Sequence, residues 1–176
     1  LAGAESEIKR LVEILGFPIL PTWPVLDLFP ATHPLVVGAF GTHGTRFANY
    51  TVQNADLVLA IGARLDTREA GSPYKDFARG AHKIIVDIDS AELQKLPKYG
   101  MDVDLLVHAD AGAFASLLAD HIANTRQPDF KTWKTQISEW RTKYPICVPE
   151  YWTELLVNPY VFVEVLSEAV RPDEIL

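Results

Sequence analysis

Three short groups of residues combine glycine, arginine and acidic side chains in ways that suit a phosphorylated ligand. The first is Gly41-Thr42-His43-Gly44-Thr45, where two glycines let a ligand approach the backbone and the following helix offers N–H groups to an anion. The same residues are equally consistent with an ordinary glycine turn in which Thr45 caps that helix. The group therefore predicts either an anion site or the start of a helix.

The second group is Gly62-Ala63-Arg64-Leu65-Asp66-Thr67-Arg68, which directly follows a nearly continuous apolar run. Arginine matches the geometry of a phosphate with two parallel donors, so Arg64 and Arg68 are candidate phosphate ligands, with Asp66 between them. The alternative is a surface network of arginine and aspartate, which contributes little to stability. We favour the ligand interpretation.

The third group is Asp87-Ile88-Asp89-Ser90. An acidic residue that ends a strand about 25 residues after Gly62 resembles the carboxylate that holds a ribose in dinucleotide folds. Asp89 and Ser90 are alternatively the cap of the next helix, and Asp110 is either a ligand contact or a cap in the same way. We expect no metal site among these residues. Together the three groups suggest a nucleotide with phosphate and ribose, although the full G-x-G-x-x-G pattern is absent.

The overall composition excludes several other functions. The formal net charge is −7 and no cluster of lysine and arginine stands out, which argues against nucleic-acid binding. No apolar run approaches the length of roughly 18 residues that a membrane helix needs. The single cysteine, Cys147, forms no internal disulfide and has no evident base partner, so we expect it to be inert. These features predict a cytoplasmic, soluble protein without membrane or nucleic-acid partners.

The elements that must position the three groups alternate between helices and buried strands. The expected helices cover residues 5–15, 45–54, 91–96, 110–123 and 128–144, and the expected strands cover 56–62, 82–89 and 103–108. Ser90 is the expected cap of the helix over 91–96, and a short apolar run at 17–22 follows the first helix. Such alternation predicts an α/β fold with a doubly wound parallel sheet covered by helices on both faces.

The composition changes after about residue 124, which suggests more than one unit. We expect a nucleotide-binding-like domain over 1–127, a largely helical connector over 128–157 and the opening of a further domain over 158–176. Asn158-Pro159 starts that last segment as a helix cap followed by proline, and Glu174-Ile175-Leu176 has the pattern of a strand beginning. We interpret the chain as a fragment of a longer protein.

The order of these residues along the chain resembles the central domain of thiamine-diphosphate-dependent enzymes, with the pattern of acetolactate synthase and its relatives. The resemblance extends from about residue 3 to about residue 123, and Asn158-Pro159-Tyr160 resembles the entry to the pyrophosphate-binding domain of such enzymes. Its residues are Thr32-His33-Pro34, Gly38, 41–45, Ala48-Asn49-Tyr50, 54–64, Asp66, Arg68 and 86–92.

This resemblance implies a Rossmann-like sheet of about six parallel strands and a domain that binds FAD, ADP or no nucleotide. It places the nucleotide contacts on Gly41, Thr42, His43, Gly44, Gly62, Ala63, Arg64, Asp66, Arg68, Asp87, Ile88 and Asp110. Thiamine diphosphate and Mg²⁺ would bind outside this chain, because neither the segment with the activating glutamate nor the Gly-Asp-Gly motif occurs here. No catalytic residue is therefore assigned.

For the parent enzyme, the resemblance implies a reaction that joins or cleaves a carbon–carbon bond next to a carbonyl, on a keto acid or an aldehyde. It also implies contacts with the other domains of the same chain and assembly into a homodimer or homotetramer. Two other functions remain open from the residues alone. One is a non-catalytic scaffold that is only stabilised by a nucleotide. The other, which the missing glycine pattern disfavours, is a nicotinamide-dependent oxidoreductase domain.

Overall fold

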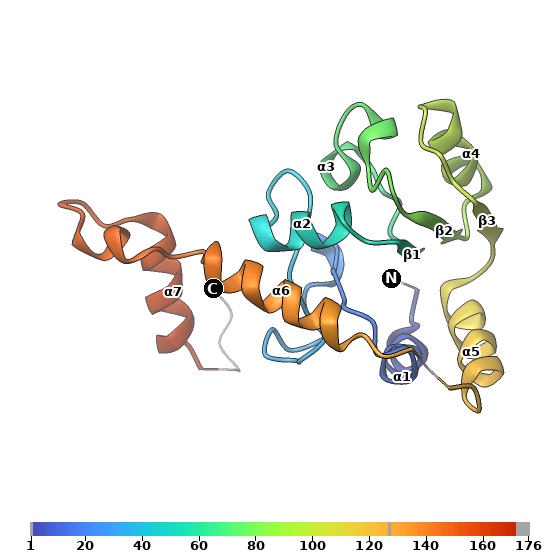
Figure 1. Cartoon of the computed structure of the whole chain (residues 1–176), viewed down its shortest axis with the longest axis horizontal. Helices are drawn as coiled ribbons and strands as arrows, with labels where there is room; N and C mark the ends of the chain where they lie inside the picture. The colour runs from blue at the N-terminus through green and yellow to red at the C-terminus, as the bar shows by residue number, and fades with distance from the viewer. Residues whose placement is uncertain (1, 127, 172–176) are drawn as a thin grey trace.

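A three-stranded parallel sheet lies at the centre of the main domain in the computed structural model, which describes residues 2–126 and 128–171. The strands β1 (Leu57–Ile61), β2 (His82–Asp87) and β3 (Leu105–His108) are hydrogen-bonded in sequence order, so that β1 pairs with β2 and β2 pairs with β3. Each connection between them therefore crosses from one end of the sheet to the other, as parallel pairing requires. Figure 1 shows the strands between two groups of helices.

The helices lie close to the predicted positions. The α-helices with counterparts in the sequence analysis are α1 (Glu5–Leu15), α2 (Arg46–Gln53), α4 (Ser90–Lys98), α5 (Ala111–Ile122), α6 (Lys131–Lys143) and α7 (Pro159–Ala169). The short elements α3 (Thr67–Ala70), η1 (Trp23–Val25), η2 (Tyr74–Asp76) and η3 (Pro149–Thr153) have no predicted counterpart.

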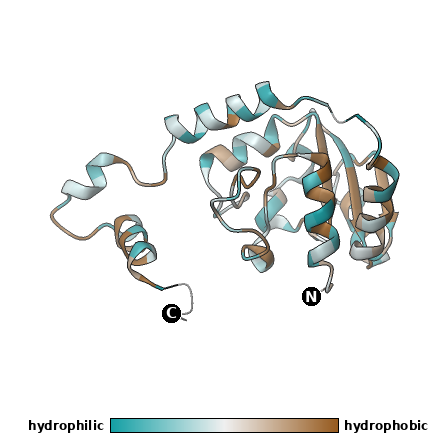
Figure 2. Ribbon diagram, turned by 90° about the horizontal axis from the view of Figure 1, so that it is seen from below, coloured by the Kyte–Doolittle hydropathy of each residue, from teal (hydrophilic) through white to brown (hydrophobic). Residues whose placement is uncertain are grey.

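The hydrophobic core has two parts, one on each face of the sheet. Val58, Ala60 and Ile85 face one side, where they join Phe47, Phe77, Leu93 and Leu96 in the larger cluster. Ile61 belongs to the other side, where Leu11 of α1 meets Ala115 and Ala119 of α5. Alternate residues of a strand point to opposite faces, so helices cover the sheet on both sides as predicted. Figure 2 shows hydrophobic residues, in brown, along the strands and on the helices beside them.

The expectation of about six strands is wrong for the described residues, where the sheet has three. Outside the named strands, the backbone of Ile19 forms an isolated parallel bridge with Val36. Ile19 lies between Pro18 and Pro21, which have no N–H to donate, and Gly38 leaves the extended conformation with φ +136°. These residues limit the pairing to a single bridge.

Helix caps identify the beginnings of the helices. Thr45 accepts a hydrogen bond from Ala48 N at 3.2 Å, and Asn158 accepts one from Tyr160 N at 2.9 Å, which confirms both as caps. Ser90 is not a cap: Asp89 accepts from Ala91 N at 2.8 Å, and Ser90 is the first residue of α4. The strand expected at 174–176 lies outside the described residues.

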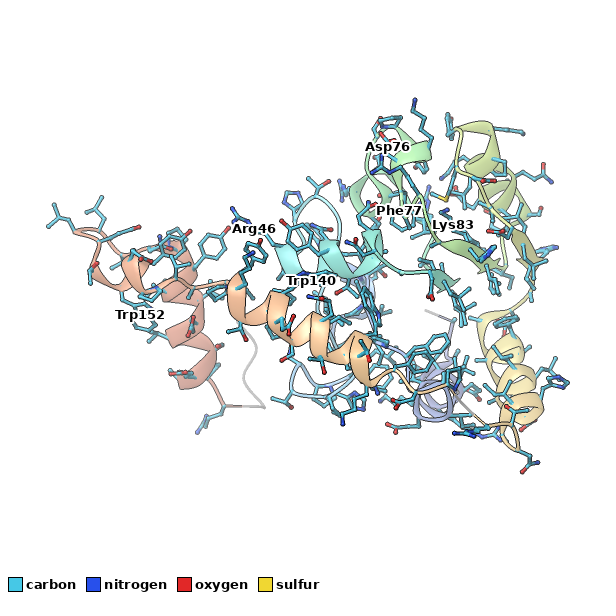
Figure 3. The ribbon with its side chains drawn as sticks, in the orientation of Figure 1. Arg46, Asp76, Phe77, Lys83, Trp140 and Trp152 are labelled. Atoms are coloured by element: carbon cyan, nitrogen blue, oxygen red, sulfur yellow. The ribbon has the colours of Figure 1, made fainter. Side chains whose placement is uncertain are left out.

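The connector helix α6 packs against the main domain. Trp140 lies against Tyr50 of α2 with ring centroids 5.8 Å apart, as Figure 3 shows for the side of α6 that faces α2. The Arg141 guanidinium donates to the carbonyl oxygens of Val36 and Val37 at 2.9 and 3.0 Å. Ile137 is buried in the larger cluster. The connector is therefore attached to the domain by apolar and polar contacts.

Beyond α6, the segment from Pro145 to Val170 extends away from the main domain, and in Figure 3 Trp152 lies far from the sheet. Helix α7 has no buried residue. Leu155, Leu156 and Val157 are 100%, 79% and 76% exposed. Contacts within this segment are local, such as the stacking of Tyr151 on Tyr160 at 5.9 Å between ring centroids. We call residues 145–170 the C-terminal arm.

Cys147 lies in this arm beside Glu164 of α7. A hydrogen bond to the Glu164 carboxylate, together with burial, raises the pKa of the Cys147 thiol to about 11. Because the thiolate is the nucleophile, we expect iodoacetamide to label Cys147 slowly at pH 8 and faster as the pH approaches the raised pKa. Glu164→Gln removes the negative charge, so the thiol should ionise at lower pH and label several-fold faster at pH 8. Mass spectrometry measures the labelling rates. Equal rates in both proteins would show that Glu164 does not control the ionisation of the Cys147 thiol.

Candidate functional site

The candidate residues that directly follow the three strands lie along one edge of the sheet. Gly62 N donates to Val86 O at 2.8 Å, and Ala109 N donates to Asp87 O at 3.1 Å, so the residues that follow the three strands are neighbours. We call this region, with Gly62–Leu65, Asp87–Ile88 and Ala109–Asp110, the carboxyl edge. Ligands of open parallel sheets bind at this edge.

The turn after β1 has an unusual backbone. Gly62, Arg64 and Leu65 all have positive φ, at 60°, 56° and 47°. This region is unfavourable for residues other than glycine. Leu65 is only 1% exposed, and its burial offsets the cost. Leu65 N also donates to Ala63 O at 2.6 Å, so the buried leucine fixes the turn and with it the point from which the Arg64 side chain extends.

Gly62 is open toward solvent at this turn. A methyl group placed there would meet nothing nearer than the Ala111 Cβ, at 4.0 Å. The Arg64 side chain is 66% exposed. The open Gly62 backbone and the exposed Arg64 guanidinium thus adjoin at one strand end, a combination that suits a phosphate.

The loop over Gly41–Thr45 is held mainly by contacts within the protein. Gly41 N donates to Asn49 Oδ1 at 2.7 Å, and Asn49 Nδ2 donates back to Gly41 O at 3.0 Å. Thr42 N, Gly44 N and Thr45 N donate to Arg68 O, Gly41 O and Ala39 O at 2.7, 3.0 and 3.1 Å. These amides are not free for an anion, so a ligand contact here would use the exposed side chains of Thr42 and His43. His43 lies against Trp23 with ring centroids 5.1 Å apart.

The contact between Thr42 and Arg68 joins the glycine loop to the segment that follows β1. Within this segment Asp66 caps α3 by accepting from Arg68 N at 2.7 Å. A hydrogen bond with Glu69 lowers the pKa of Asp66, while burial, and then the hydrogen bond with Asp66, raises the pKa of Glu69. Of these two carboxyls, Glu69 is therefore the weaker acid. Arg68 itself is exposed.

The third predicted group divides between structural roles and exposed positions. Asp87 Oδ1 accepts from Asp89 N at 2.9 Å, and Asp110 Oδ1 accepts from Ala113 N at 2.9 Å as the cap of α5. Ile88 is 68% exposed, and its carbonyl lies 2.9 Å from His108 Nε2. Each carboxylate keeps a second oxygen for a further contact. Whether these residues bind a ligand stays a prediction.

The sequence analysis gave no role to Glu92, which belongs to the same region. Glu92 Oε1 lies 3.3 Å from Arg64 Nη2, and Glu92 Oε2 contacts Lys95 Nζ. The hydrogen bond from Lys95, and then the one from Arg64, lowers the pKa of Glu92. Its position three residues after the cap Asp89 matches a capping-box pattern, which was the available signal in the sequence.

Other features of the described residues are less informative. A hollow of about 170 Å³ lies against α6, with Pro18, Pro34 and Arg141 among its lining residues, and is separate from the carboxyl edge. Over residues 2–126 and 128–171, no three histidine, cysteine or acidic side chains are grouped as a metal ion would need. The helices in these ranges are too short or too polar to cross a membrane.

Comparisons with known proteins agree on one family. The sequence profile described as thiamine pyrophosphate enzyme, central domain, matches residues 1–118. A probable chloroplastic acetolactate synthase 2 from Oryza sativa subsp. japonica is 34% identical over 173 residues, which cover 97% of this chain and 26% of that protein. The acetolactate synthase large subunit of Cyanidium caldarium is 31% identical over 173 residues, which cover 97% of this chain and 29% of that protein. The chain therefore spans between a quarter and a third of the length of these relatives.

Proposed function

Because this chain belongs to the thiamine pyrophosphate enzyme family and carries its central domain, we propose that its carboxyl edge binds an adenine nucleotide, FAD or ADP. The observation that supports the proposal is the turn after β1, where the open backbone of Gly62 adjoins the exposed guanidinium of Arg64. The nucleotide would hold the domain in its folded form, since a ligand that binds only the folded state stabilises it.

The residues around this turn suggest how the nucleotide lies. Arg64 and Arg68 would hold the phosphates, and Asp87 would use its second carboxylate oxygen for the ribose. The exposed Ile88 side chain would cover part of an aromatic ring. We further propose that Thr42, His43, Ala63, Asp66 and Asp110 would contact the nucleotide, and that Gly41 and Gly44 would shape the loop that carries Thr42 and His43.

For the whole enzyme we propose the reaction of an acetolactate synthase-like carboligase or lyase, which joins or cleaves a carbon–carbon bond beside the carbonyl of a keto acid or aldehyde. Thiamine diphosphate, with Mg²⁺, would supply the carbanion-stabilising chemistry from segments outside this chain. The role of this chain would be structural, through contacts with other domains in a homodimer or homotetramer. We also propose that the enzyme acts in the cytoplasm.

Titration of the purified chain with FAD, ADP and NAD⁺ tests the nucleotide proposal. At a concentration 100 times its dissociation constant, FAD or ADP should raise the melting temperature by about 5–10 °C, and FAD fluorescence should change on binding. A shift with NAD⁺ alone would instead support a nicotinamide-dependent domain. The absence of any shift would contradict nucleotide binding and leave a scaffold domain.

A further inference from the structure

Glu92 forms an ion pair with Arg64, whose guanidinium is the group that we propose binds a phosphate. The two side chains come from different elements, the turn after β1 and the first turn of α4. Their closest atoms, Arg64 Nη2 and Glu92 Oε1, are 3.3 Å apart. A phosphate that binds Arg64 through two parallel hydrogen bonds would use an edge of the guanidinium that includes Nη2, the nitrogen that the carboxylate contacts.

The geometry makes the Arg64 half of this contact exchangeable. The Arg64 side chain is 66% exposed, and exposed ion pairs contribute little free energy because water screens them. The backbone of Arg64 is fixed by the buried Leu65, so exchange requires only rotation of the side chain. The pair can therefore open without disturbing the turn.

The Glu92 half is held more firmly. Its side chain is 21% exposed, and its second oxygen contacts Lys95, one turn further along α4, whose side chain is 24% exposed. A negative charge in the first turn of a helix is also favoured by the helix dipole. When the Arg64 side chain moves away, Glu92 is still paired with Lys95, so its carboxylate keeps a positive charge beside it.

We propose that Glu92 is a positioning residue that competes with the nucleotide for Arg64. In the free protein the Glu92 carboxylate holds the Arg64 side chain beside the first turn of α4. When a phosphate takes the place of that carboxylate on Arg64, Glu92 remains paired with Lys95. This inference rests on the proposed nucleotide binding at the carboxyl edge. It assigns Glu92 an effect opposite to that of a ligand-binding residue, because removal of its charge strengthens binding instead of weakening it.

A double-mutant cycle with ADP as the probe tests this inference. By isothermal titration calorimetry at constant salt, Glu92→Gln should bind ADP about three- to fivefold more tightly than the unmodified chain, since it removes a competing exposed ion pair. In the Arg64→Gln background, Glu92→Gln should have no effect, because Glu92 acts only through Arg64. Glu168→Gln, on the remote helix α7, removes the same charge and should leave the affinity unchanged.

Three results would overturn the inference, and they are distinguishable. If Glu92→Gln binds ADP equally well or more weakly, Glu92 is not a competitor. If it tightens binding to the same extent with and without Arg64, the effect is a general loss of negative charge. If the unmodified chain binds no ADP, the proposed function fails together with the inference. Uncharged adenosine serves as a second probe, and its affinity should not change in Glu92→Gln.

Discussion

Replacement of Gly41 by alanine is expected to lower the free energy of unfolding by at least about 3 kcal/mol. A Cβ at this position would lie 2.1 Å from Arg68 O and 2.8 Å from Glu69 Cα, both of which belong to the backbone and cannot rotate away. The φ of +96° adds backbone strain for any residue other than glycine. The glycine loop and α3 would have to separate, and the hydrogen bond from Thr42 N to Arg68 O would break.

Two other glycines provide matched controls for this substitution. Gly71 has a φ of +75° but no atom within 4 Å of its Cβ position, so Gly71→Ala measures backbone strain alone. Gly80 has neither a positive φ nor a close neighbour, and Gly80→Ala should change stability by less than about 0.5 kcal/mol. Urea unfolding followed by circular dichroism should rank the three in this order of increasing damage: Gly80, Gly71, Gly41. A Gly41→Ala protein as stable as Gly80→Ala would contradict the described contact with Arg68.

Simultaneous replacement of Arg64 and Arg68 by alanine should weaken ADP binding by about 30- to 100-fold, because each arginine would lose a charge-assisted hydrogen bond to phosphate. Both side chains are exposed, so the melting temperature without ligand should remain close to that of the unmodified chain. Calorimetric titration with ADP measures the first effect, and a thermal melt without ligand measures the second.

The control for this pair replaces Arg79 and Arg126, which are also exposed. Arg79 precedes β2 and Arg126 follows α5, so both lie near the opposite end of the sheet from Gly62. This double variant changes the net charge equally and should retain the affinity for ADP. If Arg64→Ala/Arg68→Ala unfolds, the arginines are structural, and if it binds ADP normally, the phosphate site lies elsewhere.

Local sequence patterns were sufficient to predict most of the helices and the three strands. The caps Thr45 and Asn158 were predictable because each side chain bonds a backbone N–H only two or three residues further along the chain. The three strands were likewise predictable from their apolar runs, the nearly continuous run of β1 above all. The edge strand β3 is less covered than its pattern suggests, because Leu105 and Leu106 are 51% and 36% exposed. The count of about six strands came from the family resemblance and not from the strand patterns of this chain, which indicated three. The apolar run at 17–22, which contains two prolines, contributes only the isolated bridge between Ile19 and Val36.

Features that depend on tertiary contacts could not be predicted in the same way. The left-handed conformation of Arg64 arises because its neighbour Leu65 is buried, and no local pattern indicates that burial. The pairing of Arg64 with Glu92 depends on how α4 packs beside the turn after β1. The glycine loop appeared open to an anion, yet Asn49 and Arg68 O occupy the amides of Gly41 and Thr42.

The absence of buried residues in α7 affects how this part of the molecule responds to temperature. Its 11 residues are fewer than an isolated helix needs for stability in water, about 12–15, and its partners in η3 are few. Its helix content should follow a helix–coil equilibrium of its own, and should decline gradually on warming while the sheet still melts cooperatively. The ellipticity of the whole chain would then be the sum of a sloping baseline and a sigmoidal transition.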